Sequence, residues 1–200
     1  MNHDQTLRWV LILVFVVVLP VGLYHRLRSE STREKLDRRQ EGLFILSTLR
    51  PLGAAFGLGL IAWMINPDSM AWSAFQLPAW LRWSGVALLA LAVALLVWTF
   101  RSLGSNLTDT VVTRQRHTLI SHGPYRWIRH PFYDCAALLT VAISLITANW
   151  FLFGTGLIVF ILLIIRTRTE EQNLVARFGD AYRTYMEQTG RFFPRIGASR

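Results

Sequence analysis

The sequence has little charge and almost no cysteine for a chain of its length. Only 16% of its 200 residues are charged and 52% are hydrophobic, whereas soluble domains carry about 25% charged residues. The single cysteine, Cys135, excludes an internal disulfide and a thiolate metal cluster, and we expect no metal site. Long repeats and low-complexity stretches are also absent from the sequence. The composition therefore indicates an integral membrane protein.

The apolar residues are clustered into five runs, which predict an all-α membrane protein with about five transmembrane helices. A spanning helix needs about 20 residues, and the second run meets this length, while the first and third approach it with their flanks. The last two runs are short and only Asn149 separates them, so we expect a tight helical hairpin with both ends on one side of the membrane. The runs are residues 9–24, 43–65, 83–100, 135–148 and 150–165.

Positive charge alternates along the chain with the apolar runs. Residues 26–42 hold six Lys or Arg, residues 101–133 hold five and residues 166–200 hold seven, but the connector 66–79 holds none. Because Lys and Arg accumulate in cytoplasmic loops, this pattern predicts an outside N-terminus and a cytoplasmic C-terminus. Attraction to anionic membrane lipids accounts for the net charge of +9, so we expect lipid contacts and no nucleic acid. The first run has a barely cationic leader and no small-residue cleavage site, which favours a retained span over a signal peptide.

The chain divides into an anchoring half and a working half. Residues 1–100 are predicted to form a three-helix membrane anchor with a basic cytoplasmic loop, and residues 101–200 a catalytic half. In the C-terminal tail an apolar stripe predicts two short helices, separated at Gly179, that pack on the membrane surface or on the loop at 101–133. Within the second run, Gly53-x-x-x-Gly57 predicts close helix packing.

Two polar stretches carry the residues suited to chemistry. In "HTLISHGPYRWIRHPFYDC", residues 117–135, Gly123-Pro124 predicts a turn, and Pro131 keeps the preceding residue out of the helical region. The interfacial aromatic belt is the simpler interpretation for Trp127 and Phe132 alone. In "RTRTEE", residues 166–171, an arginine and a glutamate four apart share a helix face. The hairpin returns this second stretch to the same membrane face as the first, so the two are expected to converge.

These stretches resemble the isoprenylcysteine carboxyl methyltransferases and their bacterial relatives. The shared pattern is H-x-L-(V/I)-x-x-G-P-Y-x-x-x-R-H-P-x-Y, a helical hairpin, R-x-x-x-E-E, F-G-x-x-Y and a closing apolar-Pro motif, over roughly residues 100–196. The resemblance implies a bacterial inner-membrane enzyme with a cytoplasmic catalytic face. The sequence departs from the family pattern at one point, where Cys135, preceded by Asp134, stands in place of the usual glycine.

The resemblance also implies the cofactor and the residues that hold it. S-adenosyl-L-methionine is expected to bind at ten positions, whereas Arg166 positions the methyl-accepting substrate. Arg129 and Glu171 are possible supporting residues, and Glu170 is expected to matter more than its neighbour. The cofactor-binding positions are His117, Thr118, Leu119, Ile120, Tyr125, His130, Pro131, Phe132, Tyr133 and Glu170.

The expected reaction is methyl transfer to a lipophilic acceptor, with an isoprenylcysteine-type carboxylate favoured. A carboxylate needs no strong base and can be oriented by an arginine, whereas an amine must lose a proton first. A phospholipid amine or a small thiol is the first alternative. The others are a membrane reductase or isomerase with the same R-H-P-x-Y core, and a non-enzymatic transporter or scaffold, for which Arg50 inside the second run is the best evidence.

Overall fold

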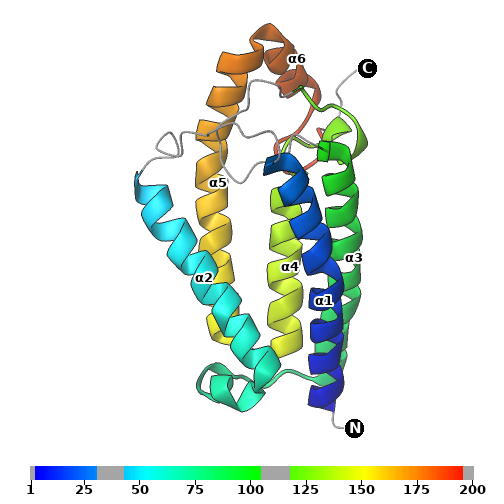
Figure 1. Ribbon diagram of the computed structural model, residues 1–200, viewed down its shortest axis with the longest axis vertical. Coiled ribbons are helices and arrows are strands. Elements are labelled where there is room, and N and C mark those ends of the chain that lie inside the picture. Colours follow the sequence, from blue (N-terminus) through cyan, green and yellow to red (C-terminus); the bar gives the residue numbers. More distant parts are fainter. Residues whose placement is uncertain (1–2, 31–42, 105–117, 196–200) are drawn as a thin grey trace.

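The computed structural model describes residues 3–30, 43–104 and 118–195, and every regular element within these ranges is a helix. Most of the basic loop, residues 31–42, lies outside them. The predicted all-α class is confirmed: five long helices form a bundle, and a sixth, short helix folds over one end of it (Figure 1). The long helices are α1 (His3–Glu30), α2 (Leu43–Ile65), α3 (Ala79–Leu103), α4 (Pro131–Thr147) and α5 (Trp150–Phe178); the shorter elements are α6 (Asp180–Gln188) and the 3-10 helices η2 (Pro67–Ser73) and η4 (Gly123–Arg126).

Four of these helices, α1, α2, α3 and α5, are long and apolar enough to cross a membrane, and α4 is a shorter apolar helix of 17 residues. The predicted tight hairpin is confirmed, because α4 ends at Ala148 in a left-handed conformation and α5 starts directly after Asn149. The N-terminal run is part of the folded bundle, since Leu7 and Leu11 of α1 are buried in the core.

The length of α5 differs from the prediction. The last apolar run was expected to end at residue 165, with a separate short helix after it, but α5 continues without a break for 29 residues. No glycine or proline interrupts it between Gly156 and Gly179, so the polar residues simply extend the helix. At about 1.5 Å per residue α5 is longer than the roughly 30 Å hydrocarbon core requires, and its polar residues follow the apolar run 150–165. Only α6 is a separate helix, beginning after a glycine with φ of 57°.

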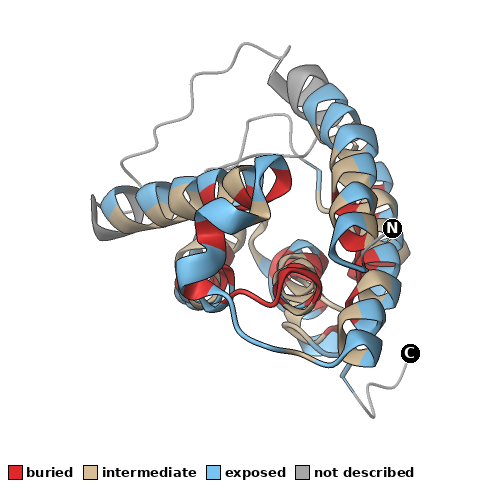
Figure 2. Ribbon diagram, turned by 90° about the horizontal axis from the view of Figure 1, so that it is seen from below, coloured by how far each residue is buried: buried red, intermediate tan, exposed pale blue. Residues whose placement is uncertain are grey.

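Small residues allow the helices to pack closely, although not those predicted. A Cβ on Gly53 or Gly57 would meet nothing within 4 Å, so the predicted packing through this pair is wrong. Instead, Gly85 of α3 lies against α4, and Gly156 of α5 lies against Thr140 of α4. Buried positions accordingly gather on the facing sides of the helices, and exposed positions cover their outer sides (Figure 2).

At the end of the bundle that carries the 66–79 connector, two arginine side chains donate hydrogen bonds to backbone carbonyls near the ends of helices. Arg8 donates to the carbonyls of Met64 and Ile65 at the end of α2. Arg82 donates twice to the carbonyl of Ile146 near the end of α4, at 3.0 and 2.9 Å. Such cations satisfy carbonyls that have no partner within their own helix.

Candidate active site

The opposite end of the bundle carries a turn that delivers the aromatic residues to the site. Gly123 has φ of 61°, and a Cβ there would lie 2.1 Å from the Ser102 hydroxyl oxygen, so only glycine fits. The predicted Gly-Pro turn is confirmed as η4. As predicted, His130 is not helical, but Pro131 occupies the first turn of α4. The helix therefore begins four residues earlier than expected, and Tyr133 is fixed by helical geometry.

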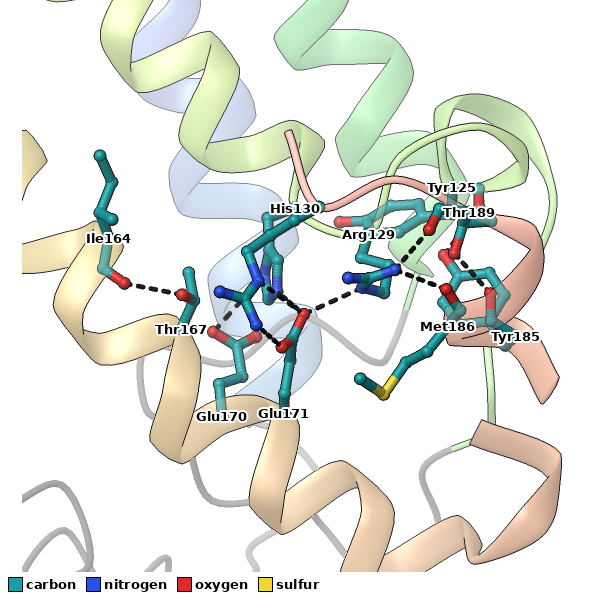
Figure 3. Close-up of polar contacts among 11 residues, drawn as sticks. Tyr125, Arg129, His130, Ile164, Thr167, Glu170, Glu171, Tyr185, Met186 and Thr189 are labelled. Atoms are coloured by element: carbon teal, nitrogen blue, oxygen red, sulfur yellow. Dashed lines mark hydrogen bonds and ion pairs between the residues drawn. The ribbon is translucent and has the colours of Figure 1, made fainter. Parts of the chain in front are cut away.

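Glu171 of α5 is the most highly connected acid described at this end (Figure 3). Its side chain is 6% exposed. One carboxylate oxygen accepts from Arg129 Nε at 2.9 Å, from His130 Nε2 at 3.2 Å and from Arg191 Nε at 3.2 Å. The other oxygen accepts from a terminal nitrogen of Arg191. These bonds join the loop before α4, helix α5 and the C-terminal segment at one buried carboxylate.

The contacts of Glu171 lower the pKa of its own carboxyl and require a proton on one ring nitrogen of His130. Burial alone would raise the pKa of the Glu171 carboxyl, but hydrogen bonds from His130, Arg191 and Arg129 outweigh burial and hold the pKa at about 2. A ring nitrogen that faces a carboxylate oxygen must carry a proton, because two lone pairs would repel each other. We therefore assign a proton to Nε2 of His130, and its other ring nitrogen, Nδ1, faces Glu170. This Nδ1 lies 3.9 Å from the nearer oxygen of Glu170, beyond hydrogen-bond distance.

Glu170 is more open to solvent and faces the aromatic residues. Its side chain is 28% exposed, and one oxygen accepts from the Tyr133 hydroxyl at 2.6 Å. The rings of Tyr133 and His130 are stacked, with centroids 5.4 Å apart and planes 3° from parallel. Tyr125 is buried nearby: burial and the charge of Glu170 raise its pKa well above the usual value. Arg166, one turn before Glu170, is close enough for its charge to act on Tyr133.

The C-terminal segment after α6, residues 189–195, closes over the loop that precedes α4. The backbone N–H groups of Arg129 and His130 donate to the carbonyls of Gly190 and Arg191, at 2.9 and 3.1 Å. Arg129 also donates to the carbonyls of Met186 and Thr189. Tyr185 of α6 is buried, and its hydroxyl donates to the carbonyl of Tyr125 at 2.7 Å. Helix α6 therefore packs on the loop, one of the two places predicted for the apolar stripe. We call residues 189–195 the C-terminal strap.

The structure brings together half of the predicted site residues. Tyr125, His130, Tyr133 and Glu170 converge, Arg166 lies beside them, and the supporting residues Arg129 and Glu171 hold the loop. Pro131 acts as the first residue of α4, and Phe132 is exposed, with its ring 5.9 Å from that of Phe100 on α3. Thr118, Leu119 and Ile120 form an irregular, exposed or half-buried segment leading towards η4. His117 lies outside the described residues.

Sequence reasoning missed Arg191 as a site residue. It lies 20 residues beyond Glu171, outside any helical repeat that would place the two on one face. The only local signal is Gly190, where an added Cβ would lie 1.6 Å from the carbonyl oxygen of Phe193, which marks a tight turn of the strap. The position of Arg191 depends on how this turn docks against the loop.

The fold and site define an all-α integral membrane protein with an aromatic and acidic site at one end of its bundle. A family model described as phospholipid methyltransferase matches residues 80–181. Because this match covers half of the chain, the chain belongs to the phospholipid methyltransferase family. The matched region includes α3, the loop with its Gly-Pro turn, the α4–α5 hairpin and the Arg166 to Glu171 stretch.

Several named proteins are similar to this chain. The cobalt-zinc-cadmium resistance protein CzcN of Cupriavidus metallidurans is 28% identical over 60% of this chain and 56% of its own length. The human protein-S-isoprenylcysteine O-methyltransferase is 25% identical over 68% of this chain and 50% of its own length. The methanethiol S-methyltransferase of Mycobacterium tuberculosis is 34% identical over 37% of this chain and 30% of its own length. The chain thus spans about half the length of the first two relatives.

One solved structure shares the fold. The eukaryotic intramembrane Ras methyltransferase ICMT (isoprenylcysteine carboxyl methyltransferase) superimposes with a TM-score of 0.54 at 24% identity. The similarity covers 76% of this chain and 53% of the other. It establishes the membrane fold, and the acceptor of this chain has to be argued from its own site.

Proposed function

We propose that this protein is a membrane methyltransferase that takes a methyl group from S-adenosyl-L-methionine and transfers it to a lipophilic acceptor. The observation that carries the proposal is the convergence of Tyr125, Tyr133 and Glu170 beside the polar extension of α5. This part of α5 projects beyond the apolar segment, so a water-soluble cofactor and a membrane-dissolved acceptor can meet there. Family membership supports the same reaction class.

The residues at this site fit the proposed cofactor. S-adenosyl-L-methionine carries a sulfonium and an ammonium group, and both are cations. Aromatic faces attract such cations, and the stacked rings of His130 and Tyr133 provide a flat aromatic surface. The carboxylate of Glu170 is partly exposed and fixed by the Tyr133 hydroxyl, so it can accept hydrogen bonds from an ammonium group. The segment from His117 to Ile120, with Tyr125 and the His130–Tyr133 run, is proposed to complete the binding site.

The cofactor supplies an activated methyl group, because its sulfonium carbon is already electron-poor. The protein has to hold the acceptor in line and keep water away, and correct placement alone lowers the barrier substantially. Burial of Tyr125, His130 and Tyr133 contributes to the exclusion of water. The Glu171 network contributes rigidity, since it fixes the loop against α5 and the strap.

Two classes of acceptor are supported by different residues. An isoprenylcysteine-type carboxylate suits Arg166, whose guanidinium can orient it by two parallel hydrogen bonds. An amine or thiol carries a proton that must leave before attack, and Nδ1 of His130 lies 3.9 Å from a carboxylate oxygen of the partly exposed Glu170. This imidazole beside a carboxylate is the specific observation that favours the second class.

We also propose the orientation of the protein. The C-terminus and the site would lie on the cytoplasmic side of a bacterial inner membrane, with the N-terminus outside. The lipid bilayer would be the source of the acceptor. Reporter fusions in the 66–79 connector and at the C-terminus test this arrangement, and reporters on the same side would contradict it.

Two measurements on the purified protein in detergent test the proposed activity. They are the binding of S-adenosyl-L-methionine and the transfer of its methyl group to an added lipophilic acceptor. We expect calorimetry to show binding of S-adenosyl-L-methionine, and Glu170→Gln to raise its Kd about 10- to 100-fold through loss of one charge-assisted contact. The control is Glu187→Gln, an exposed acid on α6, which should leave the Kd unchanged. Absence of binding by the unaltered protein, or equal effects of both substitutions, would contradict the proposal.

A further inference from the structure

A cavity lies between α5, α6 and the C-terminal strap, and the site described above does not account for it. Its volume is about 430 Å³. Two arginines and an amide line it beside apolar side chains, a combination suited to an anion that carries an apolar part. These residues are Arg168, Gln172 and Val175 of α5, Met186 of α6 and Arg191 of the strap.

The cavity faces away from the residues proposed to hold the cofactor and the acceptor. Arg168, Gln172 and Val175 are spaced by four and three residues, so they share one face of α5. Arg166 and Glu170 precede Arg168 and Gln172 by two positions each, which is about 200° around a helix. The cavity and the Glu170 face therefore lie on opposite sides of α5.

The cavity carries positive charge that the described chain does not neutralise. Arg168 is exposed and makes no hydrogen bond or ion pair with any residue in the described ranges. Arg191 binds Glu171 through Nε and one terminal nitrogen, and its side chain is still 39% exposed. Glu171, which also lines the cavity, is shared with Arg129. Three arginines against one carboxylate leave a net charge of +2, so the cavity attracts an anion.

The geometry of the donors favours a phosphate over a carboxylate. An arginine presents a planar set of N–H groups that pairs with two oxygens at once. A carboxylate has only two oxygens, in one plane, and a single arginine can occupy both of them. The oxygens of a phosphate point in several directions, so they can accept from Arg168 and from the exposed edge of Arg191 together.

The position of the cavity along α5 fits the phosphate level of a bilayer. Arg168 follows Ile165, the last residue of the apolar run, by three residues, or about 4.5 Å along the helix. The head-group layer on each side of a bilayer is about 5–7 Å thick. The cavity extends from this layer towards water as far as Val175, so both a lipid head group and a soluble phosphate can reach it.

We propose that this cavity is an accessory binding site for a phosphate group, separate from the methyl-transfer site. Arg168 and Arg191 would bind the phosphate oxygens, Gln172 would donate a further hydrogen bond, and Val175 and Met186 would contact the apolar part of the ligand. The ligand chemistry has two sources, an anionic phospholipid without an amine and free phosphate. The inference does not depend on the proposed methyl transfer.

Three probes distinguish the sources: dioctanoylphosphatidylglycerol, dioctanoylglycerol, which has the same chains without phosphate, and inorganic phosphate. Native mass spectrometry of the purified protein from detergent measures the Kd of the two lipids, and calorimetry that of inorganic phosphate. The variants are Arg168→Gln, which removes one charge, and Ala176→Trp, which fills the cavity from another residue of its lining. The control is Arg183→Gln, an arginine of α6 whose side chain is 63% exposed.

We expect dioctanoylphosphatidylglycerol to bind at least 10-fold more tightly than dioctanoylglycerol. Arg168→Gln should raise the Kd of dioctanoylphosphatidylglycerol about 10-fold, the loss expected for one charge-assisted contact, and Ala176→Trp should raise it at least as far. Arg183→Gln should leave it unchanged. Tighter binding of the phospholipid than of inorganic phosphate would identify a lipid as the ligand, and equal binding would identify the phosphate group alone; either result supports the site.

Other results would overturn the site. Equal binding of the two lipids would show that only the acyl chains are bound. An unchanged Kd of dioctanoylphosphatidylglycerol in both cavity variants, or the same rise in Arg183→Gln, would show that the contact is not located in this cavity. Competition between S-adenosyl-L-methionine and dioctanoylphosphatidylglycerol would make the cavity part of the cofactor site. Failure of the unaltered protein to bind S-adenosyl-L-methionine would contradict the proposed function and leave the phosphate site standing.

Discussion

The two ends of the helical bundle use buried polar groups in different ways. At the connector end, Asn149 is fully buried: its side chain donates to the Met70 carbonyl at 3.2 Å and to the Ser73 hydroxyl at 2.7 Å, and accepts from the Leu152 N–H. Arg82 likewise donates a hydrogen bond to a backbone carbonyl of α4. At the site end, Glu171 binds three side chains from distant segments. At the connector end the polar groups bind the termini of helices, whereas at the site end they join the loop before α4 and the C-terminal strap to one buried carboxylate on α5.

This difference shows at which end of the bundle buried polar groups lack hydrogen-bond partners. The interactions of Asn149 satisfy backbone groups that any tight hairpin leaves open, so they are complete without a ligand. At the site end, one buried oxygen of Asp134, next to Tyr133 in the sequence, has no hydrogen-bond partner among the described residues. Unused hydrogen-bonding capacity is thus found beside the aromatic residues rather than in the hairpin turn.

The largest expected effect is the loss of the Glu171 carboxylate. Glu171→Ala would leave the side chain of Arg129, which is 9% exposed, without its anion. Removing one partner of a buried ion pair costs about 3–5 kcal/mol. We expect a large drop in Tm, measured by thermal unfolding in detergent. A Tm within about 1 °C of that of the unaltered protein would show that the network does not hold the site end together.

The pH dependence of stability should follow the same residue. The pKa of the Glu171 carboxyl is about 2 in the folded protein, whereas its ordinary value of 4.5 applies to the unfolded chain. The ionised carboxylate therefore favours the folded state. This stability is fully present above about pH 4.5 and is lost as the pH falls towards 2; at 1.36 kcal/mol per unit it amounts to about 3 kcal/mol. Unfolding free energies between pH 6 and 3 should show the loss. Glu171→Gln should flatten this part of the profile, and an unchanged slope would point to other carboxylates.

A smaller effect is expected at the connector end. Asn149→Ala removes the N-cap of α5 and two hydrogen bonds to the η2 segment, which should cost about 1–3 kcal/mol. Because these bonds serve only the hairpin end, the Kd of S-adenosyl-L-methionine should be unaffected. Parallel thermal unfolding and calorimetry measure the two quantities. A variant that keeps its Tm but loses cofactor affinity would contradict the separation of the two ends.

The smallest effect is expected for an ion pair that is exposed to solvent. Asp180 and Arg183 at the start of α6 form a pair with side chains 93% and 63% exposed. Asp180→Asn should change stability by less than about 0.5 kcal/mol, because solvent screens such pairs. Thermal unfolding of this variant beside Glu171→Ala tests whether burial, rather than charge, sets the size of the effect. Similar changes in Tm for Asp180→Asn and Glu171→Ala would show that burial does not set the size of the effect.

Much of the fold was predictable because its determinants are local. Apolar runs predicted the membrane helices, Asn149 between two runs predicted the hairpin, and Gly123 followed by Pro124 predicted the turn. Each of these depends on hydrophobicity or on backbone freedom within a few residues. The end of α5 was not predictable in this way, because polar residues are compatible with both a separate helix and a continuation of the same one. The division into an anchor and a catalytic half stays a prediction.

The relative roles of the two adjacent acids depended on tertiary structure. Spacing from Arg166 predicted that Glu170 is the more important, and for cofactor binding this stays a prediction. The structure adds a separate role for its neighbour, because Glu171 is the acid that binds Arg129, 42 residues away, and Arg191, 20 residues away. Neighbouring residues on a helix point about 100° apart. The sequence therefore determined that two acids would leave the membrane together, while the docking of the loop and the strap decided which of them is buried among cations.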